Sequence, residues 1–192
     1  MPNRPPFLQI VVHDPDQSPG ITGLCAGFER GSWRAKAFAD HLMRALPEFC
    51  LTYSEYSALN HDNAVELIAQ AAQRVYRTDK FKNRGEFGEL LLHVVLRQVF
   101  DTLPAISKIY YKDSANDTVK GFDAVHVVAS RDALELWLGE VKFYSDIDAA
   151  IRDVVAELTN HTQVDYLRGE FVAIKSKIDP NWPQAERLKH LL

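Results

Sequence analysis

The sequence predicts a mixed α/β fold in which helices flank a mixed central sheet. One observation behind this prediction is the order of patterns in residues 85–161, namely a helix, three consecutive strands and a second helix, which is typical of layered α/β proteins. A second is composition, since 46% of the 192 residues are hydrophobic and 25% are charged, as in a globular protein. A third is that no apolar run approaches the roughly 20 residues that a membrane helix needs.

The length of the chain favours one domain over residues 1–192. Within it, residues 1–84 are expected to form an N-terminal elaboration of helices and strands, and residues 85–175 the core. Residues 187–192 have the pattern of an unfinished helix, which leaves open that the C-terminus is truncated.

The first predicted element is a strand at residues 7–13, which the turn-forming residues 14–20 end. A helix is expected from Ser32, because apolar residues recur at helical spacing over residues 35–46. Pro47 is expected to stop this helix, since proline lacks the backbone N–H that a helix interior needs.

Residues 49–53 are predicted to form a short strand. Asn60 or Asp62 is expected to cap a second helix that extends to about residue 76. The segment before residue 85 is therefore predicted to end in a helix and a polar connection.

The clearest helical pattern spans residues 85–100, and its wide apolar face consists of Phe87, Leu91, Val94, Val95 and Val99. Glu86, Glu89 and His93 fall on a narrower stripe at spacings of three and four residues. This helix is expected to pack on the sheet with its apolar face.

Three strands are expected next, at residues 106–112, 121–129 and 134–144, with polar turns between them. The first two are predicted to form a hairpin, and the third follows a short turn.

A long helix follows the third strand. It is capped by Ser145 or Asp146 and ends at about residue 161. Four apolar residues are predicted to face inward from it: Ile147, Ile151, Val154 and Leu158. Residues 170–174 are expected to return to the sheet.

Cysteine use and the N-terminal sequence predict a cytoplasmic protein. Cys25 and Cys50 stand alone, without C-x-x-C spacing, and two reduced buried thiols are favoured over a disulfide between them. The first residues also lack the apolar region and small-residue cleavage site of a secretory signal.

Charged side chains occur within the second and third predicted strands, where burial would be costly without a partner. The period of two places Glu140 and Lys142 on the same face, and Asp123 lies among apolar residues of the preceding strand. If these strands pair, the two carboxylates converge and repel each other unless a cation lies between them.

Oxygen ligands favour Mg²⁺ or Mn²⁺ over zinc. A lysine beside such an ion can orient a water molecule, so the pattern is typical of metal-assisted phosphodiester hydrolysis. The alternatives are an ordinary charge pair on an edge strand for Glu140 and Lys142, and a turn residue for Asp123.

Asp123 followed by Glu140-Val141-Lys142, after a Gly-Glu helix, resembles the PD-(D/E)xK restriction-endonuclease-like core. Three longer segments, RGEFGELLLHVVLR (84–97), KGFDAVHV (120–127) and LGEVKFY (138–144), resemble the DUF1837 family. This family includes the HamA nuclease subunits of Hachiman antiphage defence systems and the related AbpA proteins. The resemblance covers residues 85–158 most clearly.

The resemblance implies catalytic roles for Glu89, Asp123, Glu140 and Lys142. Glu89, Asp123, Glu140 and the Val141 carbonyl would hold Mg²⁺ or Mn²⁺, and Lys142 would orient the attacking water. Glu86 competes with Glu89, which we prefer because it lies one turn further in and Gly88 permits a close approach to the sheet. Phe122 stands where the family often has proline.

Histidines and a glutamine-tyrosine pair complete the set of candidates. His93 is expected either to contact phosphate or to pack, whereas His126 and His161 are expected to make local hydrogen bonds. The spacing of Gln163 and Tyr166 differs from the glutamine-tyrosine motif of some exonuclease relatives, so no role is assigned to them.

A basic segment precedes the Gly-Glu helix and is the predicted nucleic-acid contact, made by Arg74, Arg77, Lys80, Lys82 and Arg84. The alternative is a solvated helix exit. Because the chain as a whole carries a formal charge of −4, we expect the free protein to bind DNA weakly and to depend on a partner or a metal.

The resulting hypothesis is a metal-dependent DNA nuclease in antiphage defence that works with a superfamily 2 helicase subunit (HamB-like), as the resemblance implies. Its rivals are a non-catalytic adaptor that binds DNA or a helicase, and a ribonuclease. No membrane partner is expected.

Overall fold

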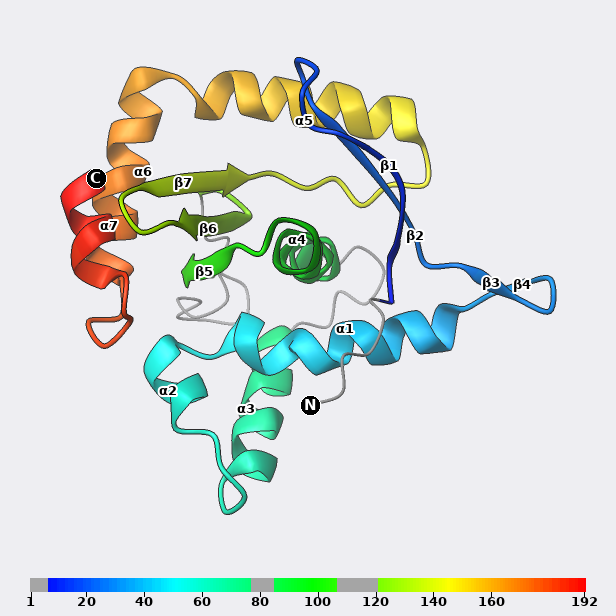
Figure 1. Ribbon diagram of the computed structural model, residues 1–192, viewed down its shortest axis with the longest axis horizontal. Helices are drawn as coiled ribbons and strands as arrows, with labels where there is room; N and C mark the ends of the chain where they lie inside the picture. The colour runs from blue at the N-terminus through cyan, green and yellow to red at the C-terminus, as the bar shows by residue number, and fades with distance from the viewer. Residues whose placement is uncertain (1–6, 77–84, 107–120) are drawn as a thin grey trace. The chain divides into compact units, whose positions relative to one another are not determined.

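The computed structural model describes residues 7–76, 85–106 and 121–192. The chain divides into two compact units, Met1–Arg44 and Ala45–Leu192, each of which is described by itself below. The described residues confirm a mixed α/β protein, with the helices and strands in the order that Figure 1 labels. Every strand pair that the structure describes is antiparallel, so the prediction of a mixed sheet is wrong for the described strands.

The first unit contains two hairpins. Strand β1 (Gln9–Asp14) pairs with β2 (Ile21–Cys25), and β3 (Phe28–Glu29) pairs with β4 (Ser32–Trp33). The strand expected at residues 7–13 is therefore confirmed with a shift of one or two residues at its ends.

Helix α1 (Ala35–Cys50) crosses the boundary between the two units. Its predicted end at Pro47 is wrong, because the helix continues to Cys50 and Leu51 N–H donates to the Pro47 carbonyl at 3.0 Å. The burial of Phe49 and Cys50, which are 3% and 0% exposed, favours this extra turn over the lost proline hydrogen bond.

The short strand predicted at residues 49–53 is also wrong. The chain instead leaves α1 and enters helix α2 (Tyr53–Ser57). Thr52 and Glu55 form a capping box in which each side chain accepts a hydrogen bond from the other residue's backbone N–H.

The next two helices agree with the sequence patterns. Helix α3 (Ala64–Tyr76) ends where expected, and helix α4 (Gly85–Phe100) has the predicted bounds. Gly88, Leu90, His93, Val94 and Leu96 are buried along α4.

The second unit is built on a sheet with the order β5-β6-β7, formed by β5 (Leu103–Ile106), β6 (Ala124–Ala129) and β7 (Leu134–Gly139). Most of the first strand predicted at 106–112 lies outside the described residues. The predicted third strand ends five residues early, at Gly139, so Glu140 and Lys142 follow the strand rather than belong to it.

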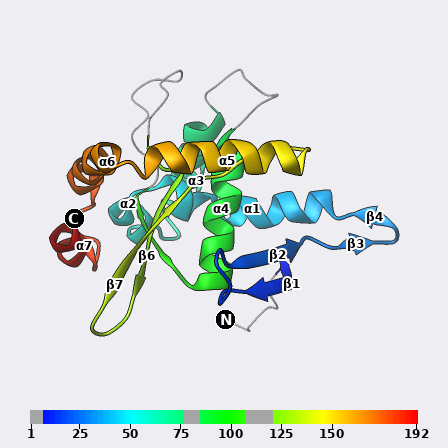
Figure 2. The ribbon, with the colours of Figure 1, turned by 90° about the horizontal axis from the view of Figure 1, so that it is seen from above.

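Helices cover both faces of this sheet. Helix α4 lies on one side, and helices α6 (Val164–Lys177) and α7 (Ala185–Leu191) lie on the other (Figure 1, Figure 2). The core on the α6 and α7 side consists of Ala105, Phe122, Val125, Val127, Ile174, Ile178, Trp182, Ala185 and Leu188. On the α4 side, a Cβ at Gly139 would lie 3.0 Å from Leu92 Cδ2, so helix and sheet are in close contact.

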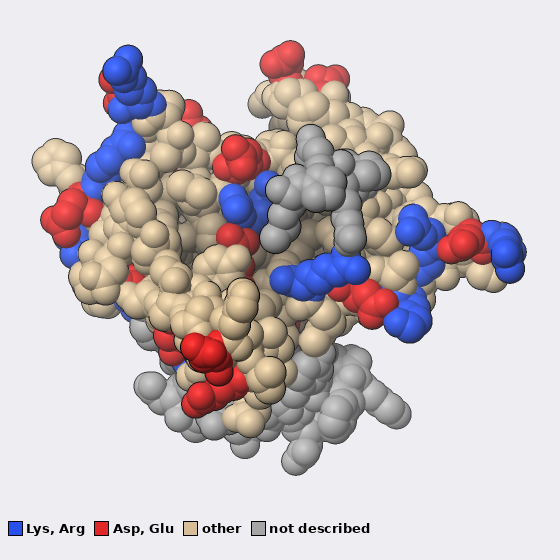
Figure 3. All heavy atoms as spheres, turned by 60° about the horizontal axis from the view of Figure 1, so that its bottom comes forward, with Lys and Arg blue, Asp and Glu red and all other residues tan. Residues whose placement is uncertain are grey.

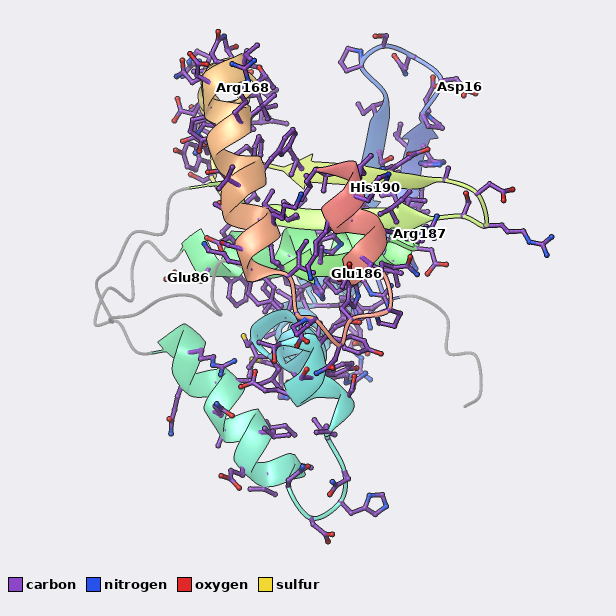
Figure 4. The ribbon with its side chains drawn as sticks, turned by 90° about the vertical axis from the view of Figure 1, so that its left-hand side faces the viewer. Asp16, Glu86, Arg168, Glu186, Arg187 and His190 are labelled. Atoms are coloured by element: carbon purple, nitrogen blue, oxygen red, sulfur yellow. The ribbon has the colours of Figure 1, made fainter. Side chains whose placement is uncertain are left out.

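Arg187 connects α7 to the turn between β6 and β7 by hydrogen bonds. Its Nη2 group donates to the carbonyl oxygens of Ser130 and Ala133, at 3.2 and 2.9 Å. Figure 4 shows Arg187 on α7, together with Glu186 and His190. Because Ala133 O also accepts from Ser130 N–H, this contact reinforces the hairpin turn.

Helix α5 (Ile147–His161) begins at the predicted cap, since Asp146 accepts hydrogen bonds from the N–H groups of Asp148 and Ala149. Its apolar face is not buried as predicted. Ile147 is 73% exposed, Ile151 is 53% exposed, and no residue of this helix is buried. Amphipathic spacing predicted the helix correctly but not what covers it.

The return to the sheet predicted at residues 170–174 is wrong. These residues belong to α6, where Phe171 and Ile174 join the core at helical spacing, and Ile178 joins it just after the helix ends.

Both cysteines are free, with Cys50 buried and Cys25 partly buried, in agreement with two reduced thiols. Among the residues that the structure describes, none of the helices has the length and apolar character to cross a membrane.

Candidate active site

The antiparallel pairing of β6 and β7 brings the predicted carboxylates to the same end of the sheet. Ala124, the first residue of β6, pairs with Gly139, the last residue of β7. Asp123 and Glu140 are the residues just outside that pair. The two segments are joined directly, because Val141 N–H donates to Asp123 Oδ2 at 2.9 Å.

Glu140 is held in a buried aromatic environment. Its side chain is 2% exposed, and its Oε1 atom accepts a hydrogen bond from His161 Nδ1 at 2.5 Å. The His161 ring stacks on Tyr166 at 4.3 Å with an interplanar angle of 11°, and Phe122 meets it edge-on at 5.4 Å. The orientation of the Glu140 carboxylate is therefore fixed by a ring that is itself held on two sides.

Tyr166 lies in an acidic region of the site. Burial raises the pKa of its hydroxyl, and the negative charges of Glu170, Glu140, Asp123 and Glu157 raise that pKa further. Carboxylates just outside β6 and β7 and on two helices therefore act on one phenol.

Lys142 reaches helix α5. Its Nζ lies 2.6 Å from Glu157 Oε2, and its side chain is only 16% exposed. Burial by itself would lower the Lys142 pKa, but the hydrogen bond and charge of Glu157, with the charges of Tyr144 and Asp123, raise it overall. Lys142 therefore carries a stable positive charge at neutral pH.

Gly88 lets α4 approach the same segment closely, as the sequence predicts. A Cβ there would lie 3.2 Å from Phe143 Cβ and 3.3 Å from the Val141 methyl groups. Of the two competing acids, Glu89 has a buried Oε2 atom, whereas Glu86 lies in the first turn of the helix (Figure 4).

Whether a divalent cation fits this site depends on which donor atoms lie together. Within residues 7–76, 85–106 and 121–192, no three Asp, Glu, His or Cys side chains form a metal-binding group, so Glu89 is not gathered with Asp123 and Glu140 in one. Mg²⁺ is commonly held by one or two carboxylates, with water and substrate phosphate completing its shell. Asp123, Glu140 and the Val141 carbonyl fit that type of donor set.

His93 packs, and the structure does not support the phosphate contact predicted as its alternative. It is 2% exposed, with Nε2 3.2 Å from Glu48 Oε2 and Nδ1 3.3 Å from His126 Nε2. Arg97 also donates to Glu48, at 3.1 Å. A residue enclosed in this way has no surface to offer to a DNA backbone.

The predicted nucleic-acid contact is only partly within the described residues. Arg74 donates to Glu55 Oε1 at 2.8 Å and to the Cys50 carbonyl at 2.6 Å, so its charge is used inside the unit. Arg77, Lys80, Lys82 and Arg84 lie outside the described residues. On the face shown in Figure 3, basic side chains are interspersed with acidic ones.

The sequence predicts no role in the site for Glu157 or Tyr166, and only a local hydrogen bond for His161. A signal was available, because Glu157 and His161 are four residues apart and so share one face of the helix that follows Glu140-Val141-Lys142. Which face of that helix meets the site is a tertiary property that the spacing does not give.

The fold and the site define a class of protein, a mixed α/β protein that gathers Asp123, Glu140 and Lys142 where two antiparallel strands meet. The chain belongs to the HamA family, whose family model matches residues 5–192. Membership in that family points to a role in Hachiman antiphage defence. No curated protein and no solved structure matched the chain significantly.

Proposed function

We propose that this HamA family member is a metal-dependent nuclease that hydrolyses DNA phosphodiester bonds in antiphage defence, with a PD-(D/E)xK-type site and a superfamily 2 helicase subunit (HamB-like) as its partner. The observation that carries the proposal is the hydrogen bond from Val141 N–H to Asp123, at 2.9 Å. It ties Asp123 to the segment that bears Glu140 and Lys142.

Each side chain has a role that suits its surroundings. Asp123 and Glu140, with the Val141 carbonyl, would hold Mg²⁺ or Mn²⁺. Glu89 on α4 is the fourth ligand that the family resemblance implies, although the described residues do not gather it with Asp123 and Glu140. The ion would supply Lewis-acid polarisation of the scissile phosphate. Lys142, kept protonated beside Glu157, orients the attacking water and offsets negative charge that develops on the phosphate.

A plasmid-cleavage assay tests the proposal. The purified chain is incubated with supercoiled DNA and Mg²⁺, with and without EDTA, alone and with its helicase. Glu140→Ala and Lys142→Ala are expected to abolish metal-dependent cutting. Glu135→Ala on β7 and Lys175→Ala on α6, both exposed residues, serve as matched controls and are expected to cut like the wild type. Cutting that survives both site substitutions contradicts the assignment.

The rival function is a non-catalytic adaptor that binds DNA or a helicase. It is favoured by the finding that the described residues form no group of three metal-binding side chains. A wild-type chain that never cuts, even with its helicase, supports the adaptor. Parallel incubation with RNA tests the ribonuclease alternative, and preferential RNA cleavage would change the substrate class but not the site.

A further inference from the structure

Helix α5 carries two side chains, one turn apart, that each hold one member of the Glu140-Val141-Lys142 segment. His161 contacts Glu140 at 2.5 Å, and Glu157 contacts Lys142 at 2.6 Å. Residues four apart in a helix are separated by about 6 Å along its axis and lie on one face. One face of α5 therefore contacts both Glu140 and Lys142.

We propose that Glu157 and His161 are positioning residues, His161 setting the orientation of the Glu140 carboxylate and Glu157 that of the Lys142 ammonium. This inference rests on the proposed nuclease function and assigns a division of labour within it. His161 acts on metal binding, and Glu157 acts on the chemical step.

The contact made by His161 is directional. A carboxylate only accepts hydrogen bonds, so Nδ1 of His161 carries the hydrogen that bonds Glu140. The ring cannot turn freely, because it is stacked on Tyr166 and meets Phe122 edge-on. Histidine and carboxylate partners of this kind orient metal ligands in other proteins, and removing them weakens metal binding or activity by about 10- to 100-fold.

Glu157 acts on a flexible side chain. Lysine has four rotatable bonds, and a carboxylate at 2.6 Å restricts where its ammonium can point. Lys142 is 16% exposed and Glu157 is 40% exposed, so the pair lies at the rim of the site, where substrate phosphate can reach it.

Two substitutions at His161 separate hydrogen bonding from packing. His161→Phe keeps a ring against Tyr166 and removes the donor, whereas His161→Asn removes the ring and keeps a donor near the position of Nδ1. With the full chain and no DNA, the measurement is the Mn²⁺ dissociation constant, obtained by electron paramagnetic resonance titration. We expect at least about 10-fold weaker binding for His161→Phe and less than about 3-fold for His161→Asn.

Substitution of Glu157 has the opposite signature. Glu157→Gln is expected to leave the Mn²⁺ dissociation constant within about 2-fold of the wild type while turnover of DNA falls by about 10-fold. The matched controls lie on α7. His190→Phe changes an exposed histidine, and Glu186→Gln breaks an exposed ion pair with Lys189 at 3.0 Å (Figure 4). Both controls are expected to leave metal binding and turnover unchanged.

The outcomes separate this inference from the proposed function. Unchanged Mn²⁺ binding in His161→Phe, or loss of binding in His161→Asn alone, overturns the positioning role and leaves the nuclease intact. If His161→Phe binds Mn²⁺ more weakly than the wild type, but the wild type never cuts DNA, the His161 role is supported and the nuclease is overturned. A wild-type chain that binds no Mn²⁺ overturns both. Circular dichroism melts check that each variant is folded. If His161→Phe does not fold, loss of Mn²⁺ binding in His161→Asn overturns the His161 role, and unchanged turnover in Glu157→Gln overturns the Glu157 role.

Discussion

Lowering the pH from 7 to 5 is expected to destabilise the protein through one buried histidine, His126. This residue is 2% exposed in β6, with Nδ1 2.7 Å from Thr102 Oγ1 and Nε2 3.3 Å from His93 Nδ1. Burial lowers its pKa from 6.5 to about 3, and the charges of His93 and Arg97 contribute in the same direction, against the opposing charge of Glu48.

The sign of the effect follows from which state binds the proton. The unfolded chain protonates His126 near pH 6.5, whereas the folded protein does not until about pH 3. The stability that depends on neutral His126 is therefore fully present above pH 6.5 and is lost as the pH falls toward 3. At about 1.36 kcal/mol per pH unit, the loss between pH 7 and pH 5 is about 2 kcal/mol.

Urea unfolding at pH 7 and pH 5 measures this difference. Comparing variants cancels the contributions of the carboxyl groups and of the other histidines. His126→Gln is expected to lower stability at pH 7 but to lose about 2 kcal/mol less than the wild type between the two pH values. His190→Gln, at an exposed position of α7, is expected to keep the wild-type dependence. Equal pH dependence in the wild type and His126→Gln would refute the reasoning.

Three further predictions concern packing and capping. Gly88→Ala is expected to reduce plasmid cleavage at a net stability cost of about 0–2 kcal/mol in thermal unfolding, because overpacking costs about 1–3 kcal/mol while helix propensity returns about 1 kcal/mol; a larger loss of stability with normal cleavage would contradict this. Leu188→Ala empties a fully buried core position. In urea unfolding it is expected to cost about 2–5 kcal/mol, against less than about 0.5 kcal/mol for Leu191→Ala, which is exposed. Thr52→Ala removes the Glu55 capping box and is expected to cost about 1 kcal/mol in thermal unfolding, whereas Thr52→Ser restores most of it.

Helices with a strong local signal could be predicted from the sequence. Helix α4 has the predicted bounds because its apolar face is wide and repeats at helical spacing, and the cap of α5 was predictable because Asp146 is a residue whose side chain bonds free N–H groups. Both signals lie within a few residues of the feature that they predict.

Features that depend on tertiary burial were not predictable in the same way. Pro47 is a local stop signal, but Phe49 and Cys50 gain more from burial than the helix loses at the proline. Residues 170–174 have an apolar run that suits a strand or a helix, and packing in the core selects the helix. The Thr52 capping box, by contrast, had a readable sequence signature that was missed.

The same distinction between local patterns and tertiary packing applies to the residues of the site. The proximity of Asp123 and Glu140 follows from strand order, because consecutive antiparallel strands place the start of one beside the end of the other. The contributions of Glu157 and His161 depend on how α5 returns across the end of the sheet, and no local pattern encodes that path.

The charges of the site connect metal binding to DNA binding in the proposed nuclease. Glu157 and Asp123 act on the Lys142 ammonium, and Glu140, which is hydrogen-bonded to His161, adds a third carboxylate, so carboxylates outnumber the lysine in this cluster. A phosphate group approaching it is repelled, and the ammonium that would attract the phosphate is already paired with Glu157. A divalent cation held by Asp123 and Glu140 would remove this repulsion. The negative phosphate would then compete with Glu157 for the Lys142 ammonium. In the proposed nuclease, DNA and metal are therefore expected to bind cooperatively at this site, and the net charge of the chain would then be a poor guide to its affinity for DNA.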